Sequence, residues 1–129
     1  MIVDSSAVVA IIESEAESNR CSQALLGGEV KRVSAANLLE VYMRIDRSGT
    51  PRARHLVEEF LDRFELTVEP VTRAQITIAR DAFYRYGRGS GHGAKLNYGD
   101  CFAYALAKQT GEPLLFVGND FGQTDIGVA

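Results

Sequence analysis

The sequence predicts an α/β protein with a mostly parallel sheet of four or five strands. Short apolar stretches at residues 2–3, 30–33, 66–69 and 114–117 alternate with longer segments. Those longer segments repeat apolar residues at helical spacing. Acidic turns also follow the first and last apolar stretches, which is where open parallel sheets place their ligands.

The totals fit one domain over residues 1–129, because a chain of this length can form a single core. The net charge of −3 argues against a strongly basic nucleic-acid binder, so any nucleic-acid contact needs a local patch. Cys21 and Cys101 lack metal-like spacing and are expected to be reduced packing residues. No signal peptide or membrane-length apolar window is found, and we expect a cytoplasmic protein without membrane contact.

The first half of the chain is predicted to contain four helices. They are residues 7–12, 15–26, 35–48 and 51–64. Ser34 and Thr50 precede the last two and are residue types that cap helices, with Pro51 at the favoured first turn. The third helix is expected to bury a face made of Leu38, Val41, Tyr42 and Ile45.

The second half is predicted to contain two helices around a glycine-rich loop. Thr72 is expected to cap the first of them, whose predicted inner face is Ile76, Ala79, Phe83 and Tyr86. Residues 87–93 contain four glycines and predict a flexible loop. Residues 101–107 are almost wholly apolar, which indicates a helix buried in the middle of the fold, and Gly111 is expected to end it.

Two candidate site residues follow strands. Asp4 comes directly after the first strand and Asp120 shortly after the last, so a parallel sheet brings both to one edge. Each also has a purely structural explanation, Asp4 as a helix cap and Asp120 as a turn residue. If Asp4 is a metal ligand, Ser5 or Ser6 can take over the capping.

Two further acids come from helices. Asp100 precedes the apolar helix, where a buried carboxylate is costly unless a cation or several donors compensate it. Its alternative role is a capping pair with Asn97. Glu40 lies nearly opposite the apolar face of its helix, where an exposed pair with Arg44 is the simplest interpretation. A functional role for Glu40 requires that this polar side line a cleft.

Together, the four acids predict a metal site. Several carboxylates in one cleft repel each other unless a divalent cation lies among them. All-oxygen ligation, without His or Cys in suitable spacing, favours Mg²⁺ or Mn²⁺ and points to phosphodiester chemistry. The residues expected to share one cation are Asp4, Asp100 and Asp120.

A basic and aromatic cluster surrounds the glycine-rich loop. Its basic residues are Arg80, Arg85, Arg88, His92 and Lys95. The tyrosines among them are Tyr84, Tyr86 and Tyr98. Such a cluster could hold an RNA backbone and stack unpaired bases. Alternatively, Arg80 and Arg85 are only the solvated face of their helix.

The chain resembles the PIN-domain ribonucleases, specifically the VapC toxins of bacterial toxin–antitoxin pairs. The resemblance covers essentially the whole chain and lies in residues 1–7, 35–40, 96–107, 114–121 and 124–126. It implies a three-layer α/β/α sandwich, an acidic Mg²⁺/Mn²⁺ site and endoribonuclease activity. By position, it assigns the catalytic acids to Asp4, Glu40, Asp100 and Asp120.

The resemblance carries further implications. Ser6 matches a hydroxyl position beside the first Asp. Some relatives have Asp where this chain has Asn119, so the division of roles among Asn119, Asp120 and Asp125 stays open. The family also implies a homodimer and a VapB-like antitoxin whose tail enters the active-site groove.

The predicted chemistry is metal-assisted hydrolysis that leaves 5′-phosphate and 3′-hydroxyl ends. Glu40 would hold water at the cation or act as a base, and the basic region at residues 80–95 would position the RNA. A phosphoacceptor receiver domain is disfavoured, because no apolar run between positions 45 and 75 ends in Asp and no Lys follows the last strand. A catalytically silent PIN-like module that binds RNA or protein remains the alternative.

Overall fold

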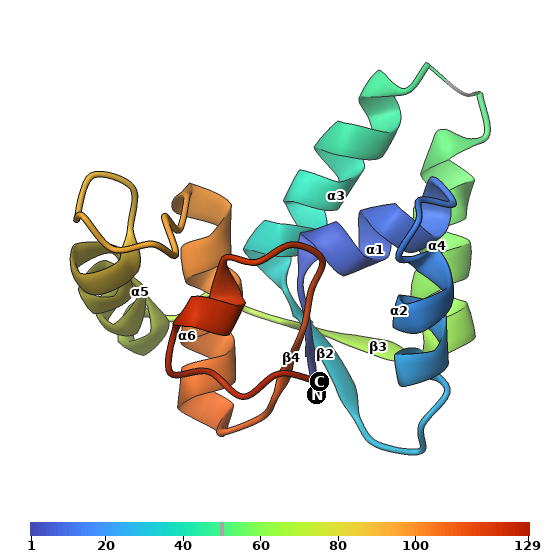
Figure 1. The fold of residues 1–129 in the computed structure, drawn as a ribbon. Coiled ribbons are helices and arrows are strands. Elements are labelled where there is room, and N and C mark those ends of the chain that lie inside the picture. Colours follow the sequence, from blue (N-terminus) through green and yellow to red (C-terminus); the bar gives the residue numbers. More distant parts are fainter. Residues whose placement is uncertain (50) are drawn as a thin grey trace.

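The computed structural model describes every residue except position 50, so the capping role predicted for Thr50 lies outside the described residues. The strands are β1 (Ile2–Val3), β2 (Lys31–Ser34), β3 (Leu66–Glu69) and β4 (Leu114–Leu115). The helices are α1 (Ser5–Ile12), α2 (Ser18–Leu25), α3 (Ala35–Arg47), α4 (Ala53–Phe64), α5 (Arg73–Tyr86) and α6 (Tyr98–Thr110), followed by the 3₁₀ helix η1 (Phe121–Gln123). Figure 1 shows α5 and α6 on one side of the sheet and α1 to α4 on the other.

The sheet is parallel with the strand order β3-β2-β1-β4. Ile2 at the centre lies opposite Arg32 on one side and Leu114 on the other. The strand predicted over 114–117 ends at Leu115, because the Val117 amide donates to the Ser6 hydroxyl at 3.0 Å. The predicted parallel α/β architecture is confirmed.

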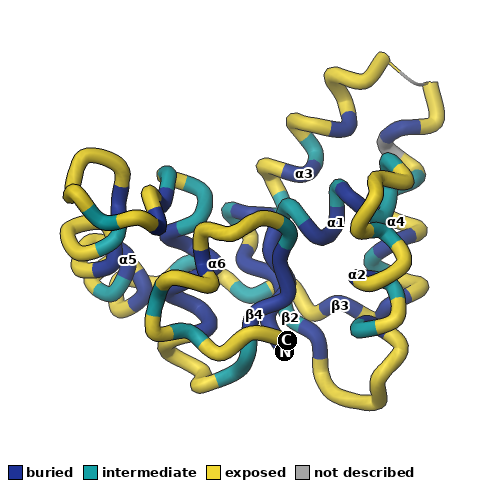
Figure 2. Tube along the Cα trace, in the orientation of Figure 1, coloured by how far each residue is buried: buried dark blue, intermediate teal, exposed yellow. Residues whose placement is uncertain are grey.

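Alternate residues of β1 and β4 belong to two separate cores. Ile2 and Leu114 pack in the core beneath α5 and α6. Val3 and Leu115 pack in the core beneath α1 to α4. Strands that are apolar on both faces need helices on both faces, which explains the three layers. Figure 2 shows the buried strands between these layers.

Most predicted helix ends are confirmed. Asn97 and Asp100 form a capping box at the start of α6, and Gly111 ends that helix at φ 70°. Thr72 caps α5 by accepting from the Gln75 amide. Three details of the prediction were wrong. Pro51 lies before α4 and not in its first turn, because that helix begins at Ala53. Ser34 precedes α3 but makes no side-chain capping bond, and α2 begins at Ser18 instead of near residue 15.

The predicted inner face of α5 was wrong in part. Ala79 is buried, but Ile76 is 46% exposed and Phe83 48% exposed. Gln75 is buried instead, because its amide donates to the Gln109 side chain at 2.9 Å and is satisfied there. Ala82, the other buried residue of this face, is as small as Ala79. Small residues therefore mediate the contact of α5 with α6, and the large apolar side chains lie at its rim.

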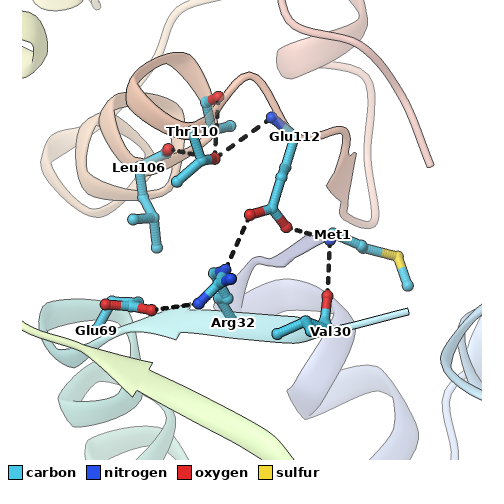
Figure 3. A network of polar contacts seen from close by, with 8 residues as sticks. Met1, Val30, Arg32, Glu69, Leu106, Thr110 and Glu112 are labelled. Carbon is cyan, nitrogen blue, oxygen red and sulfur yellow. Dashed lines mark hydrogen bonds and ion pairs between the residues drawn. The ribbon is translucent and has the colours of Figure 1, made fainter. Parts of the chain in front are cut away.

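A closed charge network connects residues of β2 and β3 with residues just before β1 and β4 (Figure 3). The Met1 ammonium group donates to the Val30 carbonyl at 2.8 Å and pairs with Glu112. Arg32 bonds Glu112 at 2.9 Å and Glu69 at 2.7 Å. Although partial burial acts to raise the pKa of Glu112, the bonds from Met1 and Arg32 hold that pKa below its usual value. Two cations thus neutralise two carboxylates in this network.

Two further expectations concern cysteines and membranes. Cys21 and Cys101 are both buried free thiols, as predicted. In the described part of the chain, no helix combines the length and apolar character needed to cross a bilayer.

Candidate active site

Asp4 lies at the carboxyl end of β1 and begins the site. It is 3% exposed, and its Oδ2 caps α1 by accepting from the Ser6 amide at 2.9 Å and the Ser6 hydroxyl at 2.5 Å. The expectation that Ser5 or Ser6 would take over the capping was wrong, because both are inside the helix. Asp4 Oδ1 is buried and has no hydrogen-bond partner among the described residues. One carboxylate oxygen therefore serves the helix and the other is free for a ligand.

Ser6 connects the first and last strands through its hydroxyl. The hydroxyl donates to Asp4 and accepts from the Val117 amide at 3.0 Å. This arrangement fixes the rotamer of Asp4 and attaches the segment after β4 to the start of α1. The structure therefore places Ser6 as an orienting residue beside the first acid.

Glu40 lines a cleft, and its carboxylate accepts hydrogen bonds from two side chains. The Ser5 hydroxyl donates to it at 2.9 Å and the Asn37 amide at 3.2 Å. The alternative pair with Arg44 was wrong, since Arg44 bonds Glu13 at 2.9 Å. A hollow of about 330 Å³ is lined by Glu40 and by residues that include Ser5, Ser6, Arg44 and Val117. The polar side of α3 thus lines a cleft, as a functional role requires.

Asn37 is a site residue that the sequence did not reveal. It is fully buried on α3, and its amide donates to both Glu40 and the Gly99 carbonyl, the latter at 3.0 Å. A Cβ on Gly99 would lie 2.5 Å from Glu40 Oε1, so the carboxylate sits directly over that glycine. An Asn three residues before a candidate Glu is the only sequence signal, since such residues are neighbours on one helix face.

Asp100 faces the acids contributed by the other elements. Its Oδ2 accepts from the Asn97 amide at 2.8 Å within the capping box. Burial, together with the charges of Asp4, Asp120 and Glu40, raises the pKa of Asp100 to about 6. Burial likewise raises the pKa of Asp4, with a smaller contribution from Glu40. The four predicted acids therefore act on one another as an acidic cluster.

The acids after β4 divide into two environments. Asp120 is exposed at the start of η1, makes no capping bond and contributes its charge to the acidic cluster. Asp125 instead accepts from Tyr104 and from Lys108, both at 2.6 Å. Asn119 is exposed, and its carbonyl accepts from Gln123 at 3.4 Å. Asp125 is therefore a structural acid paired with α6.

The chemistry of the acidic cluster fits a hard divalent cation. Its donors are all oxygen, Asp4 Oδ1 lacks a partner, and no ion pair among the described residues includes a member of the cluster. Within the same described residues, however, no three His, Cys, Asp or Glu side chains converge into a formed metal site. Asp4 and Asp120 are thus near enough to raise the pKa of Asp100, but the three carboxylates do not converge on one point.

The structure brings together only part of the predicted basic cluster. Arg80, Arg85 and Arg88 line one groove of about 740 Å³. His92 serves the loop instead, because its Nδ1 accepts from the Ala94 amide and its ring packs edge-on against Tyr86. Lys95 is exposed, with a positive φ of 53°. The RNA-binding role of all five residues stays a prediction.

Comparison with known proteins gives a consistent result. The family model for the PIN domain matches residues 1–127. Ribonuclease VapC28 of Mycobacterium tuberculosis is 45% identical over 126 residues, covering 98% of this chain and 95% of the relative. Ribonuclease VapC42 of the same species is 46% identical, with coverage of 98% and 96%.

A solved structure has the same fold. It is that of Mycobacterium tuberculosis VapC20, described as a sarcin–ricin loop cleaving toxin, which aligns with a TM-score of 0.80 at 18% identity. The alignment covers 99% of this chain and 97% of that chain. This likeness shows the PIN-like α/β fold.

Proposed function

This chain belongs to the PIN-domain family, and from that premise we propose that it is the endoribonuclease toxin of a toxin–antitoxin pair. Curated relatives at 45–46% identity over nearly the full length are VapC ribonucleases. We further propose that the activity depends on Mg²⁺ or Mn²⁺ and takes place in the cytoplasm.

The observation that carries this proposal is the unpartnered Oδ1 of Asp4. A buried carboxylate oxygen without a donor is costly, and the acidic cluster to which Asp4 belongs contains three more carboxylates. A divalent cation would neutralise these charges and supply Lewis acidity at a phosphodiester. Asp4, Asp100 and Asp120 are the residues that would hold it.

The remaining residues have supporting roles. Ser6 orients Asp4 through its 2.5 Å bond, and Asn37 fixes Glu40 against the first turn of α6. Held in this position at the cleft, the Glu40 carboxylate can accept a proton from an attacking water. Because these residues come from the start of α1, from α3 and from α6, the site exists only when the sheet and its helices are assembled.

We also propose two protein partners. VapC toxins pair with antitoxins, and an antitoxin of the VapB type would reach this acidic cleft with a basic group. A homodimer of the toxin is the second proposed assembly.

Cleavage of a panel of structured RNAs tests the proposed activity. The wild-type protein should cleave at least one RNA with Mg²⁺ or Mn²⁺, leave 5′-phosphate ends and lose the activity in excess EDTA. Asp100→Asn should lower the cleavage rate by about 10³-fold or more, because electrostatic stabilisation of the reacting phosphate is lost. Asp62→Asn, which changes an exposed carboxylate on α4, should leave the rate unchanged.

Two results would contradict the proposal. Full cleavage in excess EDTA would exclude the cation dependence. RNA binding without cleavage under every cation tested would instead support a catalytically silent module.

A further inference from the structure

Two grooves on the α5 side of the molecule form one surface. The first is lined by basic and aromatic residues that include Arg80, Phe83, Tyr84 and Arg88. The second, of about 320 Å³, shares Arg80 and Phe83 with it and continues between α5 and α6 to Tyr98. Because two residues line both grooves, the surface runs without a break from the glycine-rich loop to the first turn of α6. We call this surface the α5 track.

The α5 track ends at the first turn of α6, the helix that carries Asp100. Tyr98 is the first residue of α6. Its ring packs edge-on against Phe102, with 4.9 Å between the ring centroids. A strand of nucleic acid on the track would therefore reach the amino end of the helix that supplies one candidate catalytic acid.

Two arginines of the track are available for an anionic ligand. Arg85 is paired with Asp81 at 3.0 Å, whereas no ion pair between described residues involves Arg80 or Arg88. The acidic cluster repels phosphates, and the chain as a whole carries a net charge of −3. An anionic substrate therefore needs a cationic holding site, and the free guanidinium groups of the track can provide it.

Two tyrosine rings of the track, those of Tyr84 and Tyr98, are largely exposed to solvent. Tyr84 is 83% exposed and Tyr98 81% exposed, so neither ring contributes much to the core. Flat exposed rings can stack on unpaired bases of any sequence, whereas bases within a duplex are already stacked. Tyr86 is not available in this way, because its ring contacts both His92 and Tyr104.

The loop that carries Arg88 is closed at its base. The Arg88 amide donates to the Leu96 carbonyl at 3.0 Å, and the Leu96 amide donates to the Tyr86 carbonyl at 2.9 Å. Gly87 permits this closure, because a Cβ there would lie 2.4 Å from the Phe83 carbonyl oxygen. The backbone of Arg88 is thus fixed relative to the rings on α5, which lowers the entropic cost of binding.

From these observations we propose that the α5 track binds single-stranded RNA, with Arg80 and Arg88 on phosphates and Tyr84 and Tyr98 stacked on bases. The proposal rests on the ribonuclease function and specifies an unpaired segment of the substrate as the part that is held. The proposal leaves His92 out of the predicted RNA-binding residues, because His92 has a structural role in the loop.

Equilibrium binding without divalent cations tests the track separately from cleavage. The probes are a fluorescent twelve-nucleotide oligouridylate and a blunt RNA duplex of the same length, both in EDTA. The wild-type protein should bind the single strand more tightly than the duplex. Tyr84→Ala should weaken single-strand binding about tenfold, while Tyr84→Phe, which keeps the ring, should bind like the wild type.

Salt dependence tests the arginines. The double variant Arg80→Ala, Arg88→Ala should reduce the slope of log K against log salt by about 1.4, since each phosphate contact on a single strand contributes about 0.7. Arg63→Ala, which removes an arginine on α4 on the other side of the sheet, should leave the slope unchanged.

The outcomes separate the track from the proposed function. Equal binding of single strand and duplex, or unchanged binding by the Tyr84 and arginine variants, overturns the track even if the protein cleaves RNA. Loss of self-association or of antitoxin binding in Tyr84→Ala, with RNA binding intact, assigns the surface to a protein and also overturns it. Intact single-strand binding without any cleavage supports the track and contradicts only the ribonuclease function.

Discussion

Two charged clusters on the same parallel sheet differ in how their charges are balanced. In the network around Met1, the Met1 ammonium group and Arg32 neutralise Glu69 and Glu112 (Figure 3). At the carboxyl edge, the acidic cluster has no ion pair among the described residues, and the pKa of Asp100 rises to about 6 through burial and neighbouring acids.

The charge balance of a cluster indicates whether the cluster stabilises the fold or binds a ligand. A balanced network stabilises the folded chain by itself and needs no ligand. An unbalanced cluster destabilises the chain unless a ligand brings the missing charge. The pKa directions record this contrast, because the Glu112 pKa lies below its usual value and the Asp4 pKa above it.

The strongest test of this contrast is the effect of a divalent cation on stability. Mg²⁺ or Mn²⁺ at a hundred times its dissociation constant should stabilise the wild-type protein by about 2.7 kcal/mol, seen as a higher Tm in calorimetry. Asp4→Asn should lose most of this response, while Glu112→Gln should keep it. A Tm that is independent of both cations would show that the acidic cluster does not bind them.

The second test removes one carboxylate from the charge network around Met1. Glu112→Gln removes the charge that pairs with the Met1 ammonium group and with Arg32, and it should cost about 1–2 kcal/mol of unfolding free energy at pH 7. Chemical denaturation would measure this loss. RNA cleavage should stay at the wild-type rate, because no residue of the network belongs to the acidic cluster. A stable variant would mean that the network is incidental to folding.

The third test compares the glycines at the two ends of α6. Gly99→Ala places a Cβ 2.5 Å from Glu40 Oε1, and the flexible carboxylate can move away. Cleavage should fall about tenfold or more, with little change in Tm. Gly111→Ala has open space but a φ of 70°, so it should lose about 1 kcal/mol of stability with full activity. Equal losses of cleavage and of Tm in Gly99→Ala and Gly111→Ala would contradict the different roles expected for the two glycines.

The smallest effect is expected in the pH dependence of stability. The Glu112 pKa is lower in the folded chain than its usual value of 4.5, so the unfolded chain binds the proton more readily. Its contribution is therefore present above about pH 4.5 and disappears as the pH falls through the folded value. The Tm difference between wild type and Glu112→Gln should shrink below pH 4.5. A Tm difference that grows below pH 4.5 would contradict the lowered pKa of Glu112 in the folded chain.

The sequence by itself determined the architecture and the identity of the acids. Alternating apolar strands and amphipathic helices require a parallel sheet covered on both faces, because both faces of Ile2-Val3 and Leu114-Leu115 need partners. Strand-end placement then brought Asp4 and Asp120 to one edge, and the Asn97 capping box fixed Asp100. These features depend on neighbouring residues, so local patterns are enough to predict them.

The tertiary structure alone decided how those acids are held and what surrounds them. Periodicity placed Glu40 with Arg44 and buried Ile76 and Phe83. Contacts of α3 with the two ends of α1, and the packing of α5 on α6, reversed these assignments. Asn37 became a site residue only because α6 brings the Gly99 carbonyl to it. Local sequence cannot specify such contacts, because they depend on which segments, distant along the chain, the packed sheet brings together.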